Sequence, residues 1–153
     1  MTEAAWLPAA AETAAASAPG ASAAAVGAAP FFAAAREGKL RLQRCRACGT
    51  WAFPLRTRCQ ACGSSALQWR DASGRGTIYS HAVLHRPYHP RHEGRLPLVL
   101  AQIDLAEGVR LQSNIVDLDA DADADQIEAG REVEVAFEAL ADGSGTVPVF
   151  KLV

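Results

Sequence analysis

The sequence is short of large hydrophobic side chains, although half of its 153 residues are apolar. Aromatic residues make up only 7% and there is a single methionine, because alanine supplies much of the apolar fraction. Alanine buries little area, so the core should be smaller than the composition suggests. No apolar run approaches the ~18 residues that cross a bilayer, so we expect a soluble protein without a membrane partner. The length suits one ordinary domain or two small ones.

Residues 1–29 lack lysine and arginine altogether and contain fifteen alanines. A secretory signal begins with a positive region and a transit peptide is rich in arginine, so neither fits. We therefore expect a cytoplasmic protein. Pro8, Pro19 and Gly20 interrupt any helix that the alanines would favour. We predict a largely disordered extension over residues 1–29, whose function the sequence does not indicate.

The sequence also lacks the motifs of common catalytic sites. It has no GxSxG, no HExxH and no glycine-rich phosphate loop. We therefore predict no catalytic residue and no catalysis by this chain alone.

The chain does have a cysteine module in residues 45–63, "CRACGTWAFPLRTRCQACG". Two C-x2-C pairs stand ten residues apart, and their members are Cys45, Cys48, Cys59 and Cys62. A two-residue gap lets both sulfurs of a pair point at one ion, and the glycine after each pair suits a tight turn. Four thiolates form a closed Zn²⁺ site, with Zn–S distances of ~2.3 Å and no open position for substrate. We predict a structural zinc site.

Two other interpretations of the cysteines stay open. Disulfides would suit an oxidising compartment, which the missing secretory signal argues against. An iron centre of the rubredoxin type uses similar cysteine pairs. Zinc binding can contribute roughly 10 kcal/mol or more of folding free energy, which so small a module needs.

The net charge of −2 conceals two opposite halves. Residues 30–95 contain twelve Lys/Arg and three Asp/Glu, whereas residues 96–153 contain three Lys/Arg and twelve Asp/Glu. The basic half suggests a polyanionic ligand or an acidic partner surface. Alternatively, the two halves simply face one another.

Regular structure should begin near Pro30. The run "PFFAAAREGK" predicts a short helix with Pro30 in its first turn and Gly38 at its C-terminal end. "KLRLQR" predicts a strand that leads into Cys45, and "LQWRDASGRG" predicts a glycine-rich turn that leaves the cysteine module. We assign residues 30–70 to this helix and a rubredoxin-like zinc ribbon.

Five strands are predicted in the rest of the chain: 76–86, 97–105, 109–117, 131–139 and 147–153. Val133, Val135 and Phe137 alternate with glutamates and should face inward. Pro148 suggests that the last strand lies at a sheet edge. The fold class is thus mainly β, and the five strands fit an OB-fold barrel over residues 71–153, although a sandwich stays open.

Four histidines cluster near the end of the first of these strands: His81, His85, His89 and His92. A helix would gather them on one face, but Pro87 and Pro90 exclude a helix there. In a strand, His81 and His85 would share a face with Tyr79 and Val83. A second metal site, a ligand- or partner-binding loop and an ordinary solvated loop all stay open.

Residues 117–128 partly match the calcium-binding loop of an EF-hand, with carboxylates at its first, third, fifth and twelfth positions. The sixth position needs glycine for a sharp turn but holds Ala122. The flanks are predicted strands and not helices. We therefore predict a solvated acidic connection, either a loop or a short helix.

The run "PFFAAAREGKLRLQRCRACGTWAFPLRTRCQACGSSALQWRDASGRGTIYSHAVLHRP" resembles zinc-ribbon-plus-OB-fold proteins that are found beside thiolase genes. That family is catalogued as an acyl-CoA-associated domain of unknown function. The later pieces "LPLVLAQIDLAEGVRLQSNIV" and "IEAGREVEVAFE" are similar to its later strands. The resemblance covers residues 30–153 and leaves out the alanine-rich extension.

The resemblance implies a non-catalytic accessory subunit of a thiolase-like enzyme, which is a thiolase, an acyltransferase or an aldolase. The partner would supply the catalytic groups, in degradation of aromatic or steroid-type compounds by thiolysis or retro-aldol cleavage. This chain would stabilise the partner in a hetero-oligomer and help to bind an acyl-CoA. CoA carries phosphates, which suits the basic middle segment, and aromatic side chains could stack on its adenine. The candidate contacts to partner or CoA are Trp51, Phe53, Arg56, Arg58, Tyr88 and His89.

An alternative function is binding of single-stranded nucleic acid, which zinc ribbons and OB barrels both perform. Such a surface needs several aromatic side chains on one sheet face. The predicted barrel strands supply only Tyr79, Phe137 and Phe150, and the last strands are acidic enough to repel a polyanion. The sequence therefore favours the accessory subunit.

Overall fold

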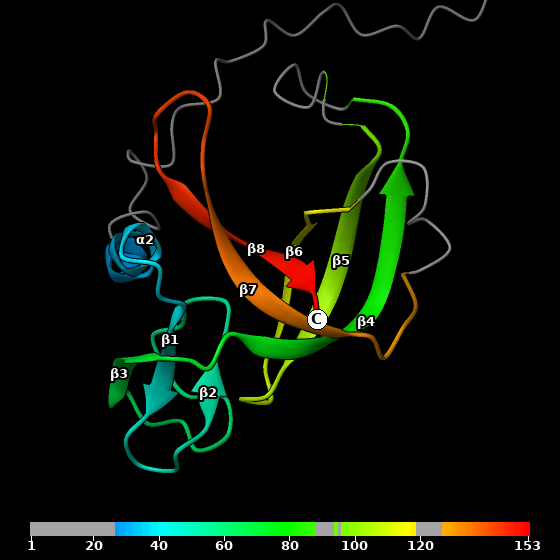
Figure 1. Cartoon of the computed structure of the whole chain (residues 1–153). Helices are drawn as coiled ribbons and strands as arrows, with labels where there is room; N and C mark the ends of the chain where they lie inside the picture. The colour runs from blue at the N-terminus through cyan, green and yellow to red at the C-terminus, as the bar shows by residue number, and fades with distance from the viewer. Residues whose placement is uncertain (1–26, 88–93, 95, 119–126) are drawn as a thin grey trace, which may run out of the picture.

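A helix, a three-stranded sheet and a closed five-stranded barrel make up the described part of the chain in this computed structural model (Figure 1). It describes residues 27–87, 94, 96–118 and 127–153. The elements are α2 (Ala29–Arg36), β1 (Arg41–Cys45), β2 (Trp51–Ala52), β3 (Leu67–Asp71), β4 (Arg75–Leu84), β5 (Leu98–Leu105), β6 (Arg110–Ile115), β7 (Glu132–Ala139) and β8 (Thr146–Leu152). Within the described residues, no helix is long and apolar enough to cross a membrane. The mainly β fold class with an OB-type barrel is confirmed, and the sandwich is excluded.

Helix α2 begins and ends as the sequence predicts. Pro30 occupies the first turn, where its missing N–H costs nothing. At the other end Gly38 takes a φ of 71°, and the backbone N–H groups of Gly38 and Lys39 donate to the carbonyls of Ala35 and Ala34. This is a Schellman motif, which satisfies the last carbonyls of the helix. The buried Ala34 and Ala35 bring the helix close to β8 and β1.

The small sheet has the strand order β2-β1-β3, and it corrects the predicted turn after the cysteine module. Residues 67–71 form a strand that pairs antiparallel with β1 along its whole length, from Arg41↔Asp71 to Cys45↔Leu67. Without β3, the backbone N–H and C=O groups on one side of β1 would have no hydrogen-bond partners, and pairing with β3 supplies those partners. The glycine-rich turn is confined to the residues around Gly74.

The barrel closes in the order β4-β5-β6-β8-β7. All neighbours are antiparallel except β6 and β8, which run parallel. Ile78, Ile103 and Phe150 are almost completely buried in its interior, and Val133 is buried as predicted. Val135 and Phe137 pack against the same core. Leu40 and Leu42 belong to this cluster too, so the ribbon and the barrel share one hydrophobic core.

The last strand is not an edge strand, which corrects the reading of Pro148. β8 lies between β7, where Phe137 pairs with Pro148, and β6, where the only register pair is Ile115↔Phe150. The Ser113 hydroxyl donates to the Pro148 carbonyl at 2.8 Å, so this side of Pro148 faces β6. A backbone N–H at position 148 would also point toward β6, where it would have no ladder hydrogen bond to form. The closed barrel therefore tolerates a proline.

A β-bulge in β4 moves Tyr79 off the face that the sequence assigns to it. Ile78 pairs with Ile103 and Ser80 with Gln102, so Tyr79 is the extra residue. His81 and Val83 pair with Ala101 and Val99 and so share a face as predicted, although His81 is exposed and Val83 is half-buried. Tyr79 lies on the outer surface instead, under the guanidinium of Arg110.

Several predicted features lie outside the described residues. They are most of the alanine-rich extension, the histidines His89 and His92, and most of the acidic connection 117–128. The predictions made for them stay predictions.

Candidate metal centre and the neighbouring apolar groove

The two cysteine pairs fold into two turns with the same hydrogen bonds. In the first, the Cys45 N–H donates to the Thr50 carbonyl at 2.8 Å and the Gly49 N–H donates to the Cys45 carbonyl at 2.9 Å. In the second, Cys59, Ser64 and Gly63 repeat this pattern at the same distances. Gly49 and Gly63 have φ values of 77° and 72°, a conformation that favours glycine. The sequence repeat CxxCG is therefore a structural repeat.

The four sulfurs converge on one point. The Sγ atoms of Cys45 and Cys62 are 3.6 Å apart, as are those of Cys48 and Cys59, and all four lie within 4.8 Å of one another. A tetrahedral ion with ~2.3 Å metal–sulfur bonds would hold its sulfurs ~3.8 Å apart. The cysteines therefore fit a metal ion of the zinc class. All four are free cysteines, which rules out the disulfide alternative in this structure.

The cysteines of the metal centre differ in the pKa of their thiols. Hydrogen bonding between the Cys48 sulfur and the hydroxyl and N–H of Thr50 lowers the pKa of Cys48 to about 6. The Ser64 N–H lowers the pKa of Cys62, but the sulfurs of Cys48 and Cys45 raise it more, to about 12. The Cys62 thiol thus resists ionisation, whereas the Cys48 thiol ionises readily. A bound cation would favour the thiolate forms and occupy all four ligands, which gives a structural and not a catalytic centre.

An apolar groove of about 410 Å³ lies between α2 and the ribbon. Its walls are Ala28, Phe31, Phe32, Leu42, Gln43, Ala52, Phe53, Pro54, Leu55 and Trp69. Gln43 is the only polar residue among them, and its side chain is already engaged with Arg56. The Gln43 amide donates to the Arg56 carbonyl at 3.1 Å and accepts from the Arg56 N–H at 2.7 Å. This pair of hydrogen bonds fixes the segment between the two cysteine pairs against β1.

Of the candidate contact residues, only Phe53 and Arg56 come together at this groove. Phe53 lies in its wall, with its ring centroid 6.2 Å from that of Phe31, and Arg56 follows the wall residue Leu55. Trp51 is half-buried against the core and lies under the Arg44 guanidinium at 5.5 Å, so its ring is largely covered. Arg58 donates to the Gly63 carbonyl at the second cysteine turn.

Tyr88 and His89 lie outside the described residues. The assignment of all six residues to partner or CoA binding stays a prediction. Three groove residues were missed by the sequence reasoning: Phe32, Leu55 and Trp69. Trp69 was missed because its segment was taken for a turn; as β3, its register opposite Gln43 would have placed it beside the groove.

A second, more polar hollow of about 500 Å³ lies on the barrel. Glu132, Glu134 and Asp104 are among its lining residues. Arg110 donates to both carboxylate oxygens of Asp104, at 2.6 and 2.8 Å, and this hydrogen bonding lowers the pKa of Asp104. The hollow is thus acidic at its rim, in contrast to the apolar groove.

Family models match most of the described chain. Residues 32–68 match the model "ChsH2, rubredoxin-like zinc ribbon domain". Residues 69–138 match "ChsH2, C-terminal OB-fold domain". The boundary between the two matches falls within β3.

Two curated proteins are similar in sequence. The "Probable enoyl-CoA hydratase alpha subunit" of Thermomonospora curvata is 39% identical over 121 residues, which cover 79% of this chain but only 36% of that protein. The chain therefore spans about a third of that relative's length. A "DUF35 domain-containing scaffold protein" of Methanothermobacter thermautotrophicus is 36% identical over 95 residues, covering 61% of this chain and 68% of that protein.

Two solved structures are similar in fold. The first, "Ltp2-ChsH2(DUF35) aldolase", contains a chain that is 37% identical, with a TM-score of 0.71 and coverage of 82% of this chain and 94% of that one. The second, a DUF35-family protein of unknown function from Sulfolobus solfataricus, is 14% identical with a TM-score of 0.54, which shows the fold alone. The matched zinc ribbon, the matched OB fold and these relatives show that the chain belongs to the ChsH2 family of DUF35 proteins.

Proposed function

We propose that this chain is a non-catalytic, zinc-binding accessory subunit of a thiolase-like enzyme that acts on an acyl-CoA thioester, with an aldolase as the favoured partner. The observation that carries the proposal is its similarity, over 94% of the matched chain, to the ChsH2(DUF35) component named in an aldolase structure. The enoyl-CoA hydratase name of a second relative supports acyl-CoA chemistry. The retro-aldol alternative is thereby favoured over thiolysis.

The zinc ribbon would hold the surface that meets the partner. Four thiolates around one ion leave no site for substrate, so the ion's contribution is to fold residues 45–62. Folding of that segment sets the positions of Phe53 and Arg56 at the groove. The reaction chemistry is assigned to the partner, which would supply the nucleophile and the general acid or base.

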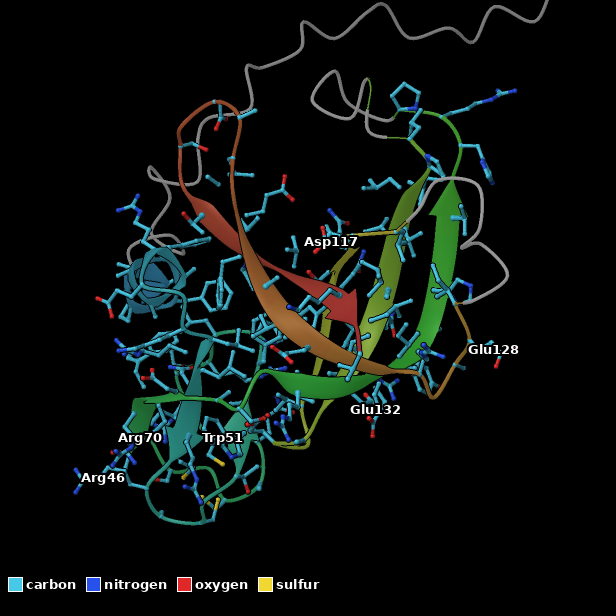
Figure 2. All side chains as sticks on the ribbon, viewed as in Figure 1. Arg46, Trp51, Arg70, Asp117, Glu128 and Glu132 are labelled. Carbon is cyan, nitrogen blue, oxygen red and sulfur yellow. The ribbon has the colours of Figure 1, made fainter. Side chains whose placement is uncertain are left out.

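A contribution to CoA binding is supported by the charge of the ribbon. Residues 27–72 contain eight Lys/Arg and only two Asp/Glu. Figure 2 shows Arg46 and Arg70 on the outer side of the ribbon, whereas Glu128 and Glu132 lie on the barrel. Guanidinium groups bind phosphates well, so the ribbon side suits the anionic end of CoA. The acyl chain would be of the aromatic or steroid type, in keeping with the family resemblance.

Nucleic-acid binding is the weaker proposal because the barrel offers few free aromatic faces. Phe150 is fully buried and Phe137 packs against the core. Tyr79 is exposed, but the Arg110 guanidinium lies over one face of its ring at 3.3 Å. Stacking on single strands needs several exposed rings, and of these three described barrel residues only Tyr79 supplies one.

Co-expression with the thiolase-like aldolase of the same organism tests the proposal. We expect the two chains to purify together and to cleave an acyl-CoA aldol substrate, and we expect this chain alone to turn over no acyl-CoA. Failure of the two proteins to associate, together with tight and salt-sensitive binding of oligonucleotides by this chain, would reverse the order of the two proposals.

A further inference from the structure

We infer that the groove between α2 and the ribbon is the docking site for an apolar side chain of the aldolase subunit, presented on a segment with acidic residues beside it. This inference rests on the proposed function and names the surface and the partner chemistry. The walls of the groove supply Phe32, Leu55 and Trp69, which no sequence motif assigns.

The interior of the groove accepts hydrocarbon and not a polar group. Gln43 is its only polar lining residue, and both ends of its amide are bonded to the main chain of Arg56. A polar occupant would therefore lose its water hydrogen bonds without a side-chain replacement. An aromatic or aliphatic anchor loses nothing on entry and gains contact with four aromatic side chains, those of Phe31, Phe32, Phe53 and Trp69.

Leu55 marks the groove as incompletely covered. Only three large hydrophobic residues of the described chain are exposed: Leu55, Tyr79 and Val153. Tyr79 is stacked under Arg110, and Val153 lines the more polar barrel hollow. Leu55, at 39% exposure, is the one that stands at the mouth of an apolar groove.

Unneutralised positive charge borders the groove. Arg36 lies one helical turn after the wall residue Phe32, so the two share a side of α2. Arg56 follows Leu55, and its guanidinium lies against the side-chain amide of Gln60, a neutral group. Neither arginine is in any of the ion pairs found among the described residues.

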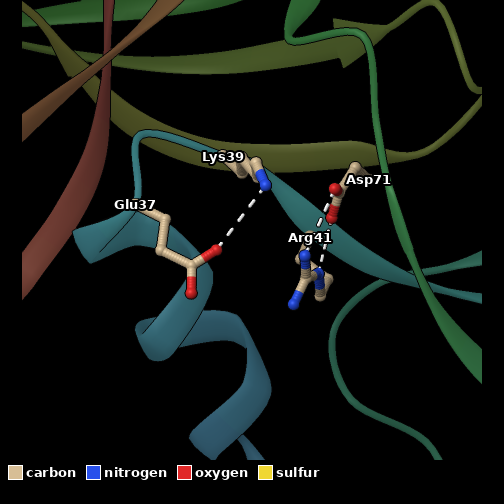
Figure 3. Close-up of polar contacts among 4 residues, drawn as sticks. All are labelled: Glu37, Lys39, Arg41 and Asp71. Atoms are coloured by element: carbon tan, nitrogen blue, oxygen red, sulfur yellow. Dashed lines mark hydrogen bonds and ion pairs between the residues drawn. The ribbon is translucent and has the colours of Figure 1, made fainter.

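Two basic residues between α2 and the middle of β1, Lys39 and Arg41, differ because each pairs with an acid (Figure 3). Arg41 pairs with Asp71 at 2.5 Å, and Lys39 pairs with Glu37 at 3.6 Å. Arg36 and Arg56, which are in none of these ion pairs, therefore leave positive charge beside the opening of the apolar groove. An anchor with carboxylates beside it complements both features, whereas a basic partner surface would be repelled.

The first experiment compares two single substitutions at exposed apolar residues. Leu55→Asp places a charge at the mouth of the groove, and Val153→Asp places the same charge in the barrel hollow, which shares no lining residue with the groove. With the co-purified aldolase subunit as the probe, we expect L55D to weaken binding at least about thirtyfold and V153D to change it less than about threefold. Zinc content and circular dichroism report whether L55D stays folded.

The outcomes separate this inference from the proposed function. If the unaltered chain binds the aldolase and L55D binds as tightly, the docking site is wrong and the accessory role stands. If the unaltered chain does not bind the aldolase at all, the proposed function fails. If L55D loses zinc, the charge variants below decide the question.

Charge reversal tests the acidic character of the anchor without entering the apolar walls. Arg36→Glu with Arg56→Glu should weaken aldolase binding about tenfold or more and reduce its dependence on salt. The matched control, Arg75→Glu with Arg86→Glu, reverses two exposed arginines on the barrel side and should have little effect. Equal losses in both double variants would overturn a docking site confined to the groove.

A photo-crosslinking residue at position 55 identifies the occupant directly. Crosslinks to the aldolase subunit in the complex support the inference. Crosslinks to residues 1–26 of the same chain, or to a second copy of it, would overturn it, because the groove would then be filled by this protein itself. A crosslinker at position 153 serves as the control and should not label the aldolase.

Discussion

The ribbon and the barrel share a core but are held together by different forces. Inside the barrel, closed strand pairing surrounds fully buried residues such as Ile103 and Phe150. The ribbon has one short sheet, and its loops converge on four thiols. A segment with so little apolar area to bury needs a metal ion to compensate for its lost conformational entropy. The ribbon can therefore be destabilised by removing its metal ion, whereas destabilising the barrel requires a mutation in its core.

Metal removal should therefore unfold the ribbon and leave the barrel folded, and this is the largest effect that we expect. We expect chelation of zinc to unfold residues 40–65, at a cost of roughly 10 kcal/mol of metal-derived folding free energy, and to abolish association with the aldolase. Amide exchange in β5 and β6 should stay slow. NMR of the apo and zinc-restored protein measures both. Full complex formation by the apo protein would exclude a scaffold role for the ribbon.

A cavity in the barrel core should destabilise the barrel without releasing the metal from the ribbon. Ile103→Ala removes a completely buried side chain from β5 and should lower the free energy of unfolding by about 2–5 kcal/mol. Zinc content should not change, because the cysteines do not depend on this contact. Gln102→Ala, at the exposed neighbouring position, is the control and should be nearly neutral. Denaturant titration and metal analysis check the pair; zinc loss in I103A would contradict the separation.

The two cysteine turns can be compared with each other by glycine substitution. Gly49→Ala and Gly63→Ala each force alanine to a positive φ, which costs roughly 1–2 kcal/mol. Neither new methyl group meets a close neighbour, so the two costs should be similar. Gly145→Ala, with no positive φ and an open environment, should change little. Competition with a zinc chelator measures the effect, and a large difference between the two turns would show that they are not equivalent.

The smallest effect should come from the ion pair on the barrel surface. Hydrogen bonding by Arg110 lowers the pKa of Asp104, so the folded state holds this carboxylate ionised more strongly than the unfolded state. The pair's contribution is present above the unfolded pKa of about 4 and disappears as the pH falls through the lower folded value. Asp104→Asn should therefore make the protein lose slightly less stability as the pH falls through this acidic range. An unchanged loss of stability in thermal melts would mean that solvent screens the pair completely.

The sequence predicted the features that depend on local spacing. Cys45 and Cys48 belong to a turn of a few residues, and Gly38 ends a helix within one turn, so neighbouring residues suffice to identify them. The alternation around Val133 is equally local. The order and bounds of the five barrel strands followed from such patterns and from the family resemblance.

The features that were missed depend on contacts between distant segments. The strand at Leu67–Asp71 exists because β1 needs a second partner, which no local pattern reveals. The bulge at Tyr79 is a property of the register between β4 and β5. The groove unites α2, β1 and the segment after β2, and only the folded chain brings Phe32, Leu55 and Trp69 together.

The double hydrogen bond between Gln43 and Arg56 links metal loading to the shape of the groove. It clamps the stretch that joins the two cysteine pairs, so Leu55 and Phe53 keep their places only while both pairs are held. A chain that has not yet received its ion would present no finished groove. Assembly with the partner would then act as a checkpoint, in which only metal-loaded copies are recruited and the supply of zinc limits the amount of active enzyme.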